Sequence, residues 1–339
     1  MAIQVKISQA IAIITAAIKA KLVPMMAGSP GSGKSQVFFQ IADEYGLKVI
    51  DLRLSQCDPT DLLGFPCVTG KRAGYMPMET FPIQGDPVPE GFNGWMLFLD
   101  EFTSASPAVQ AAAYKLVLDR MVGLHHLHEK VIIVCAGNLE TDNAIVQPMS
   151  TALQSRLVHL ELMVDSEEWG NWAVNHKINH KITDYIKFKP GNLFNFSPDH
   201  TDKTFACPRT WEFLNRIIGV LPAGSEEEMA LYAGTISEGV AREFVSFCKI
   251  YDDLPKMDEI IAKPDSVKMP DEPSILYALS GSLAHNSKAI TFDKIVTFIK
   301  RMPVEFQVVT MRETVRRNPA IKSHEGFRNW VTQSAVNMF

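Results

Sequence analysis

One short motif constrains the fold of this chain more than any other feature. Residues 28–35 read GSPGSGKS, which fits the phosphate-binding loop pattern GxxxxGK[S/T]. A short apolar segment precedes the motif at residues 22–27, and a helix-like segment follows it at residues 36–45. Glycines in such a loop let backbone N–H groups converge on phosphate oxygens. The motif and its context therefore predict a nucleotide site on an α/β fold.

The residues of the loop have different expected roles. Lys34 is expected to bring a positive charge to the β- and γ-phosphates, and Ser35 to offer a hydroxyl to Mg²⁺. The helix that begins near Lys34 adds the positive end of its dipole. The predicted nucleotide-binding set is the whole loop: Gly28, Ser29, Pro30, Gly31, Ser32, Gly33, Lys34 and Ser35. Within it, Pro30 has no N–H to donate, so the residues around it must supply the donors.

Two carboxylates follow a strongly apolar run further along the chain. Residues 95–99 read WMLFL and lead into Asp100 and Glu101. An unbroken apolar run of this length suits a strand covered on both faces of a parallel sheet. Because open α/β sheets bind ligands at the carboxyl ends of their strands, we expect Asp100 to help hold Mg²⁺. Glu101 is then expected to polarise an attacking water, a role that a protein that only binds nucleotide does not need.

A second apolar run, at residues 131–135, leads to Asn138, whose amide could contact both the water and the γ-phosphate. Further strands are expected at residues 48–52 and 157–162, and a helix from Ser106-Pro107 onward. Strands that alternate with helices in this way indicate a parallel sheet with helices on both faces.

The second half of the chain changes character. Helical periodicity is expected at residues 169–188, 211–220, 226–251, 274–283 and 292–301, and residues 252–273 are rich in Pro and Asp and are expected to form a linker. We therefore expect an α/β nucleotide-binding core at residues 1–165, a helical lid at 166–255, and a C-terminal helical region at 256–339 that packs with the lid.

Residues 64–94 form the most unusual segment of the core. Eleven of these residues are Gly or Pro. A loop this long inside a compact domain is usually functional or disordered. A functional insertion and a flexible surface excursion are the two interpretations.

Charge and cysteine content exclude several classes of protein. The 33 basic and 38 acidic residues give a net charge of −5, which argues against a dedicated, charge-driven nucleic-acid binder. The five cysteines form no CxxC pair, which argues against a disulfide framework or zinc module and favours a reducing cytoplasm. No apolar run approaches the roughly 18 residues that a membrane span needs. We expect a cytoplasmic protein without a membrane segment.

Taken in order along the chain, these segments resemble the AAA+ ATPases, and more narrowly the MoxR and dynein-related group, which includes the cobaltochelatase ATPase subunit. The resemblance rests on the phosphate-binding loop, on LFLDE at residues 97–101, AGN at 136–138, QSRL at 154–157 and PRTW at 208–211. It implies a P-loop NTPase (AAA+) core with a parallel sheet, followed by an all-helical lid and a C-terminal helical extension.

The resemblance also assigns roles to individual residues. Asn138 would be the sensor that orients the hydrolytic water, and Arg209 the lid arginine that contacts nucleotide. Arg156 would be the arginine finger that reaches the γ-phosphate of a neighbouring subunit, where such a residue adds orders of magnitude in rate. Arg120 is a rival for that role. The alternative for each arginine is a surface ion pair. A finger acting between subunits implies a homo-oligomeric ring, expected to be a hexamer.

In the same group, the segment at residues 64–94 corresponds to an insertion that projects toward the pore of the ring, and Phe65 and Tyr75 are candidates for gripping a substrate. The function implied is Mg²⁺-dependent hydrolysis of ATP to ADP by a ring that remodels, assembles or activates a protein partner. A von Willebrand factor A-domain protein is the partner type that the group commonly has. A nucleic-acid motor or restriction-type NTPase, and a nucleotide-gated scaffold, are the alternatives.

Overall fold

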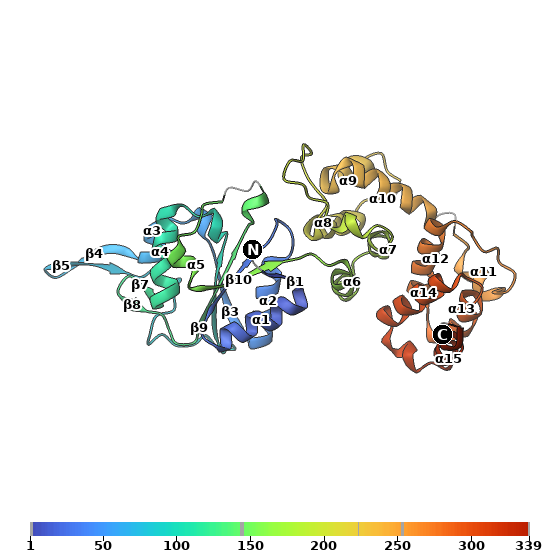
Figure 1. The fold of residues 1–339 in the computed structure, drawn as a ribbon, viewed down its shortest axis with the longest axis horizontal. Coiled ribbons are helices and arrows are strands. Elements are labelled where there is room, and N and C mark those ends of the chain that lie inside the picture. Colours follow the sequence, from blue (N-terminus) through green and yellow to red (C-terminus); the bar gives the residue numbers. More distant parts are fainter. Residues whose placement is uncertain (1–2, 143–145, 223, 252–253, 338–339) are drawn as a thin grey trace. The chain divides into compact units, whose positions relative to one another are not determined.

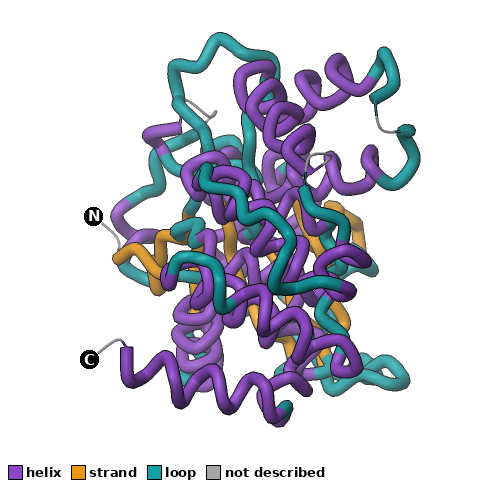
Figure 2. Tube along the Cα trace, turned by 90° about the vertical axis from the view of Figure 1, so that its right-hand side faces the viewer, coloured by secondary structure: helices purple, strands orange, loops and turns teal. Residues whose placement is uncertain are grey.

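The structure is a computed structural model that describes residues 3–142, 146–222, 224–251 and 254–337. The chain divides into two compact units (Figure 1). The first comprises Met1–Asp165 together with Ser197–His200, and the second comprises Ser166–Phe196 and Thr201–Phe339. The first unit is built around a sheet, whereas the described part of the second is mainly helical (Figure 1). Figure 2 shows the helices of the chain in purple and its strands in orange.

Within the described residues, six strands of the first unit form one parallel sheet. Its order is β1-β10-β2-β9-β6-β3. The strands are β1 (Ile3–Val5), β2 (Val23–Ala27), β3 (Leu47–Arg53), β6 (Gly94–Asp100), β9 (Val131–Gly137) and β10 (Leu157–Leu162). All of the strands expected from the sequence form, and β1 adds a strand that the sequence analysis did not predict.

The central strands of this sheet are buried on both faces, as the apolar runs predicted. Along β6, Leu97 and Leu99 belong to one core cluster and Met96 and Phe98 to the other. The first cluster packs against α4 (Pro107–Asp119), and the second against α1 (Ile7–Lys19) and α2 (Lys34–Tyr45). Figure 1 shows these helices on opposite sides of the sheet. The expected α/β fold class with a parallel sheet is thus confirmed.

The segment at residues 64–94 contains ordered structure. It begins after the short helix α3 (Pro59–Leu63) with an antiparallel hairpin of β4 (Phe65–Thr69) and β5 (Arg72–Met76). The hairpin extends away from the sheet in Figure 1. Phe65 is 63% exposed and Tyr75 is 45% exposed. The rest of the segment returns to the core, where Phe81 is buried and Ile83 pairs with Leu127.

A second hairpin lies beside the base of the first. It consists of β7 (Met121–Val122) and β8 (His125–His126). Its turn residue Gly123 has φ +57°, and a Cβ there would lie 2.6 Å from the carbonyl oxygen of Leu63 and 3.1 Å from Cβ of Tyr75. Glycine at residue 123 therefore lets the two hairpins approach closely.

The second unit is helical over its described length. Its helices are α6 (Ser166–Asn175), α7 (His180–Phe188), α8 (Pro208–Ile218), α9 (Glu228–Ile236), α10 (Glu238–Ile250), α11 (Met257–Ala262), α12 (Pro273–Asn286), α13 (Phe292–Ile299), α14 (Val304–Arg317) and α15 (Glu325–Asn337); α5 (Thr151–Gln154) belongs to the first unit.

Three expectations for this half differ from the structure. Residues 169–188 form two helices, broken at Lys177 (φ +56°), and residues 226–251 form two helices, broken at Ser237 (φ +74°). The expected linker at 252–273 contains α11, whose Ile260 is fully buried in the apolar cluster of the C-terminal helices. Residues 252 and 253 lie outside the described part of the chain.

Charged side chains join α7 to α14 inside the helical unit. Asp184 is 3% exposed, and its Oδ1 accepts a hydrogen bond from Arg317 Nη2 at 2.8 Å. Glu313, which is also buried, pairs with Lys187 and with Arg316. The hydroxyl of Tyr251 donates to Asp184 Oδ2 at 2.6 Å. We call the five charged residues the ion network: Asp184, Lys187, Glu313, Arg316 and Arg317.

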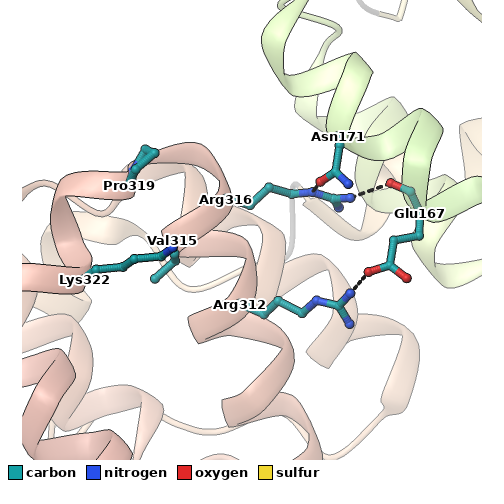
Figure 3. Close-up of a pocket in the computed structure, with 7 residues that line it drawn as sticks. All are labelled: Glu167, Asn171, Arg312, Val315, Arg316, Pro319 and Lys322. Atoms are coloured by element: carbon teal, nitrogen blue, oxygen red, sulfur yellow. Dashed lines mark hydrogen bonds and ion pairs between the residues drawn. The ribbon is translucent and has the colours of Figure 1, made fainter. Parts of the chain in front are cut away.

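An open pocket of about 370 Å³ lies beside this network, between α6 and α14 (Figure 3). Arg316 crosses from α14 to α6, where it donates to Asn171 and, at 2.6 Å, to the carbonyl oxygen of Glu167. Arg312 pairs with the Glu167 carboxylate. Both arginines are held by contacts within the chain.

Among the described residues, no helix is both long enough and apolar enough to cross a membrane. The five cysteines, all of which lie in the described part of the chain, form no disulfide, and burial raises the pKa of Cys135 far above its usual value.

Candidate nucleotide-binding site

The phosphate-binding loop connects the central strand β2 to α2. Gly31 (φ +76°) and Gly33 (φ +100°) adopt the left-handed conformation that favours glycine, and α2 begins directly afterward at Lys34. Gly28 is buried, and a Cβ there would lie 3.2 Å from Ser32 Oγ and 3.3 Å from Cβ of Leu162. The glycines thus allow the loop to turn tightly between β2 and the N-terminus of α2.

The strand order brings the other predicted residues to the same edge of the sheet. Strand β9 lies between β2 and β6, with Ala27 paired to Gly137 and Leu99 paired to Cys135. All three strands are parallel, so their carboxyl ends meet at one edge. Open α/β sheets bind ligands at such edges.

Lys34 lies at the centre of this edge. Its Nζ donates hydrogen bonds to the carbonyl oxygens of Gly28 at 2.6 Å and Ser29 at 3.1 Å, and to Asn138 Oδ1 at 3.2 Å. The loop lysine and the predicted sensor asparagine are therefore in direct contact, although 104 residues separate them in the sequence.

The predicted Mg²⁺ ligands also lie together. Ser35 Oγ donates to Asp100 Oδ2 at 3.3 Å. A hydroxyl beside a carboxylate is the type of oxygen donor set that Mg²⁺ prefers. Ser35 and Asp100 are the residues that would hold a magnesium ion at this edge.

Glu101 occupies a backbone conformation that non-glycine residues rarely adopt, with φ +55°. Its backbone N–H donates to Asp100 Oδ1 at 2.8 Å, and its carboxylate accepts a hydrogen bond from the hydroxyl of Ser55. Strained backbone of this kind is common at functional sites. Nearby on β3, burial and then the negative charge of Asp100 raise the pKa of Asp51.

Two polar groups of the loop support its use as a phosphate cradle. Within the described residues, Ser32 Oγ is buried and has no hydrogen-bond partner. Buried polar groups rarely stay unpaired, and a phosphate oxygen would accept from this hydroxyl. Ser29 Oγ donates to Asp142 Oδ1 at 3.2 Å, which ties the loop to the turn after Asn138.

Two residues near the site were missed at the sequence level. Asp142 is buried and bonds the loop, and Thr103, in the turn η2 (Phe102–Ser104), bonds the backbone of Asn138. Neither belongs to the short motifs. Their proximity to Asp100-Glu101 and to Asn138 in the sequence is the available signal.

The two candidate finger arginines differ in their surroundings. Arg156 is exposed, donates to the carbonyl oxygen of Ala152 at 2.6 Å and lies over the ring of Tyr114 at 5.2 Å. Arg120 is half-buried and donates to the carbonyl oxygens of Val131 and His128, and burial lowers its pKa. Arg120 is thus held by hydrogen bonds within the chain, whereas Arg156 is exposed.

Arg209 belongs to the helical unit. It lies in the first turn of α8, after Pro208, and is exposed. Cys207 precedes this helix, and its backbone N–H donates to Thr210 Oγ1 at 2.8 Å, an arrangement that fixes the start of α8.

No protein-family model matches the chain, and no curated protein matches it. Several solved structures are similar to it. A mutant of RuvB from Thermotoga maritima shares 17% identity over 82% of each chain, with a TM-score of 0.42. NtrX of Brucella abortus shares 13% identity over 90% of this chain and 67% of its own, with a TM-score of 0.39.

NtrX of Brucella abortus in complex with ADP shares 13% identity over 98% of this chain and 66% of its own, with a TM-score of 0.38. The identities and TM-scores are low throughout, so the function proposed for this chain rests on its own residues.

Proposed function

We propose that this chain is a Mg²⁺-dependent ATPase of the AAA+ type that acts on a protein partner. The observation that carries the proposal is the convergence of Lys34, Ser35, Asp100, Glu101 and Asn138 at one edge of the parallel sheet. This set offers a cation for phosphate, oxygen donors for a metal and an acid for a water. A protein that only binds nucleotide would not need Glu101.

The residues would divide the work as follows. The loop backbone and Lys34 would hold the phosphates, and Ser35 with Asp100 would hold a magnesium ion, which when bound would supply positive charge to the phosphates. Glu101 polarises the attacking water, and Asn138 orients it. Developing charge in the transition state is stabilised by fixed groups, which is the largest single source of rate in such sites.

A shared active site between subunits is part of the proposal. None of the five converging residues is an arginine, and Arg156 is exposed on the surface of the first unit. An arginine supplied by a neighbouring copy would complete the site. This supports a homo-oligomeric ring, with a hexamer as the expected stoichiometry. On the family resemblance, Arg209 is proposed as a further nucleotide contact.

The exposed apolar side chains of the β4–β5 hairpin support a protein substrate. Phe65, Val68, Tyr75 and Met76 are all largely exposed on one short projection. The net charge of −5 favours a protein over a nucleic acid as the partner. A von Willebrand factor A-domain protein is the partner class that the resemblance suggests.

Steady-state hydrolysis tests the enzymatic part. Wild-type protein with ATP, GTP and Mg²⁺ is compared with Glu101→Gln, which should bind nucleotide normally and lose turnover. Lys34→Ala should lose binding itself. The exposed Glu129→Gln is the matched control and should keep wild-type turnover. Wild-type turnover in Glu101→Gln would contradict the mechanism.

Capture of the substrate tests the second part. Glu101→Gln protein held with ATP should retain a host protein that is lost when Phe65 and Tyr75 are both replaced with Ala. In the otherwise wild-type protein, the double replacement should leave basal hydrolysis unchanged, since both side chains belong to the projecting hairpin and not to the phosphate-binding loop. Steep loss of a DNA-stimulated rate with salt would instead favour a nucleic-acid motor.

A further inference from the structure

One buried hydroxyl joins the two turns that carry Glu101 and Asn138. Thr103 is two residues after Glu101 and only 6% exposed. Its Oγ1 accepts a hydrogen bond from the backbone N–H of Asn138 at 3.0 Å and donates one to the carbonyl oxygen of Asn138 at 3.1 Å. A single side chain thus holds both backbone groups of Asn138.

Gly137, the residue before Asn138, leaves room for the contact between Thr103 and the backbone of Asn138. A Cβ at Gly137 would lie 2.6 Å from Thr103 Oγ1 and 2.8 Å from Thr103 Cγ2. Any side chain at residue 137 would therefore push Thr103 away. Glycine at this strand end lets the threonine reach the backbone of the next residue.

The turn that carries Thr103 is itself fixed. The backbone N–H of Ser104 donates to the carbonyl oxygen of Glu101 at 2.9 Å, and the N–H of Gln147 donates to the carbonyl oxygen of Thr103 at 2.7 Å. Glu101 and Thr103 therefore belong to one short turn. Displacing Asn138 would displace this turn, and Glu101 with it.

We propose that Thr103 is a positioning residue that fixes Asn138 relative to Glu101 during hydrolysis. This role rests on the proposed ATPase function. Asn138 Oδ1 lies 3.2 Å from Lys34 Nζ, so its amide faces the place of the phosphates, while Glu101 must act on the same water. Misplacement of such groups by about 1 Å can reduce a rate about a hundredfold.

Paired substitutions separate the hydroxyl from the volume of the side chain. Thr103→Val keeps the shape and loses the hydroxyl, and Thr103→Ser keeps the hydroxyl. We expect kcat to fall about tenfold to a hundredfold in Thr103→Val, with unchanged affinity for a fluorescent ATP analogue, and to recover in Thr103→Ser. If Thr103→Val does not fold, Thr103→Ala takes its place in the comparison with Thr103→Ser.

A double-substitution cycle tests whether the effect passes through Asn138. On an Asn138→Ala background, Thr103→Val should lower kcat little further; equal losses on both backgrounds would overturn the role. Thr310→Val is the matched control, because Thr310 is fully buried and its hydroxyl bonds the carbonyl oxygen of Phe306 in its own helix. It should keep wild-type kcat.

The outcomes distinguish this role from the proposed function. Absence of nucleotide hydrolysis in the wild-type protein would overturn the ATPase function and this role together. Hydrolysis by wild type and Thr103→Val at equal kcat would overturn only the role of Thr103.

Discussion

The carboxylate of Asp184 in α7 packs directly against Gly281 in α12, so closely that a Cβ at residue 281 would overlap it. Gly281 is in the interior of a helix, where glycine is ordinarily unfavourable. Glycine is required at residue 281 because the carboxylate of Asp184 occupies the space that a side chain would need.

We therefore expect Gly281→Ala to lower the free energy of unfolding by about 1–3 kcal/mol through overpacking. Urea unfolding of the full chain, followed by tryptophan fluorescence, measures the effect. Gly234→Ala in α9 is the matched control, since a Cβ there has nothing within 4 Å, and it should be neutral or stabilising. Equal destabilisation by both would contradict the packing argument.

Acid should destabilise the helical unit through His180. Its ring stacks on that of His285 at 4.5 Å, and burial lowers the pKa of His180 to about 4. The charges of His285, Arg317 and Lys181 also lower this pKa, whereas the carboxylate of Asp184 raises it. The unfolded chain titrates near 6.5, so it binds more protons than the folded chain between the two values.

Stability should therefore fall as the pH drops from about 6.5 to about 4, by roughly 2–3 kcal/mol from this group. The measurement is the free energy of unfolding as a function of pH. In His180→Phe this dependence should become flatter, whereas the exposed His125→Gln should leave it unchanged. An unchanged dependence in His180→Phe would show that other groups cause it.

The two candidate finger arginines should respond differently to removal. Arg156→Ala should lower kcat by about 10³-fold or more and leave stability nearly unchanged, because an exposed cation–π contact contributes only about 0.5–1 kcal/mol. Mixing Arg156→Ala with Lys34→Ala protein should restore part of the activity, because a Lys34→Ala subunit would supply its intact Arg156 to the intact phosphate-binding loop of an Arg156→Ala neighbour. No recovery on mixing would count against a shared site.

Arg120→Ala should instead lower stability by about 1–3 kcal/mol, because it leaves the carbonyl oxygens of Val131 and His128 without their donor. Thermal unfolding of both variants makes the comparison. A stable Arg120→Ala protein with no turnover would transfer the finger role to Arg120.

Ser35→Ala should raise the Mg²⁺ concentration needed for half-maximal turnover, by about tenfold to a hundredfold. The reason is that Asp100 would lose its hydroxyl partner in the proposed metal site. Titration of hydrolysis with Mg²⁺ measures the shift. The exposed Ser155→Ala should show the wild-type requirement, and an unshifted Ser35→Ala would remove the serine from the metal site.

The sheet and the convergence of the site could be predicted because both depend on local sequence signals. A strand buried on both faces must be apolar throughout, so residues 95–99 and 131–135 were recognisable. The functional groups follow these strands directly, and parallel pairing then brings them to one edge. Direct contact between Lys34 and Asn138 follows from the register of β2 and β9.

The β4–β5 hairpin was not predicted, although its turn is typical. Residues 69–71 read Thr-Gly-Lys, with Gly70 at φ +67° between two short strands. Many other glycines and prolines in residues 64–94 hid this signal. The helix breaks at Lys177 and Ser237 were also not predicted, because both residues take a positive φ that non-glycine residues rarely adopt. For the first break the available signal was Asn179, whose side chain caps α7 by accepting a hydrogen bond from the backbone N–H of Lys181.

Thr103 and Asp142 lie close to the motifs in the sequence, but that proximity alone does not assign them a role. Threonine is common in turns, and the role of Thr103 depends on which backbone groups its hydroxyl contacts. That partner is set by the pairing of β6 with β9 and by the missing side chain at Gly137. Such relationships exist only in the folded chain.

The ion network limits how the helical half can be divided. Asp184 and its partner Arg317 are 133 residues apart, on either side of the expected boundary at residue 255. A fragment that ended before α14 would keep Asp184 and its neighbour Lys187, 3.4 Å away, but would lose the closer contact to Arg317 at 2.8 Å, which is destabilising for a buried carboxylate. A lid cut at residue 255 is therefore expected to be less stable than the same residues in the full chain, because α7 and α14 stabilise each other through these charges.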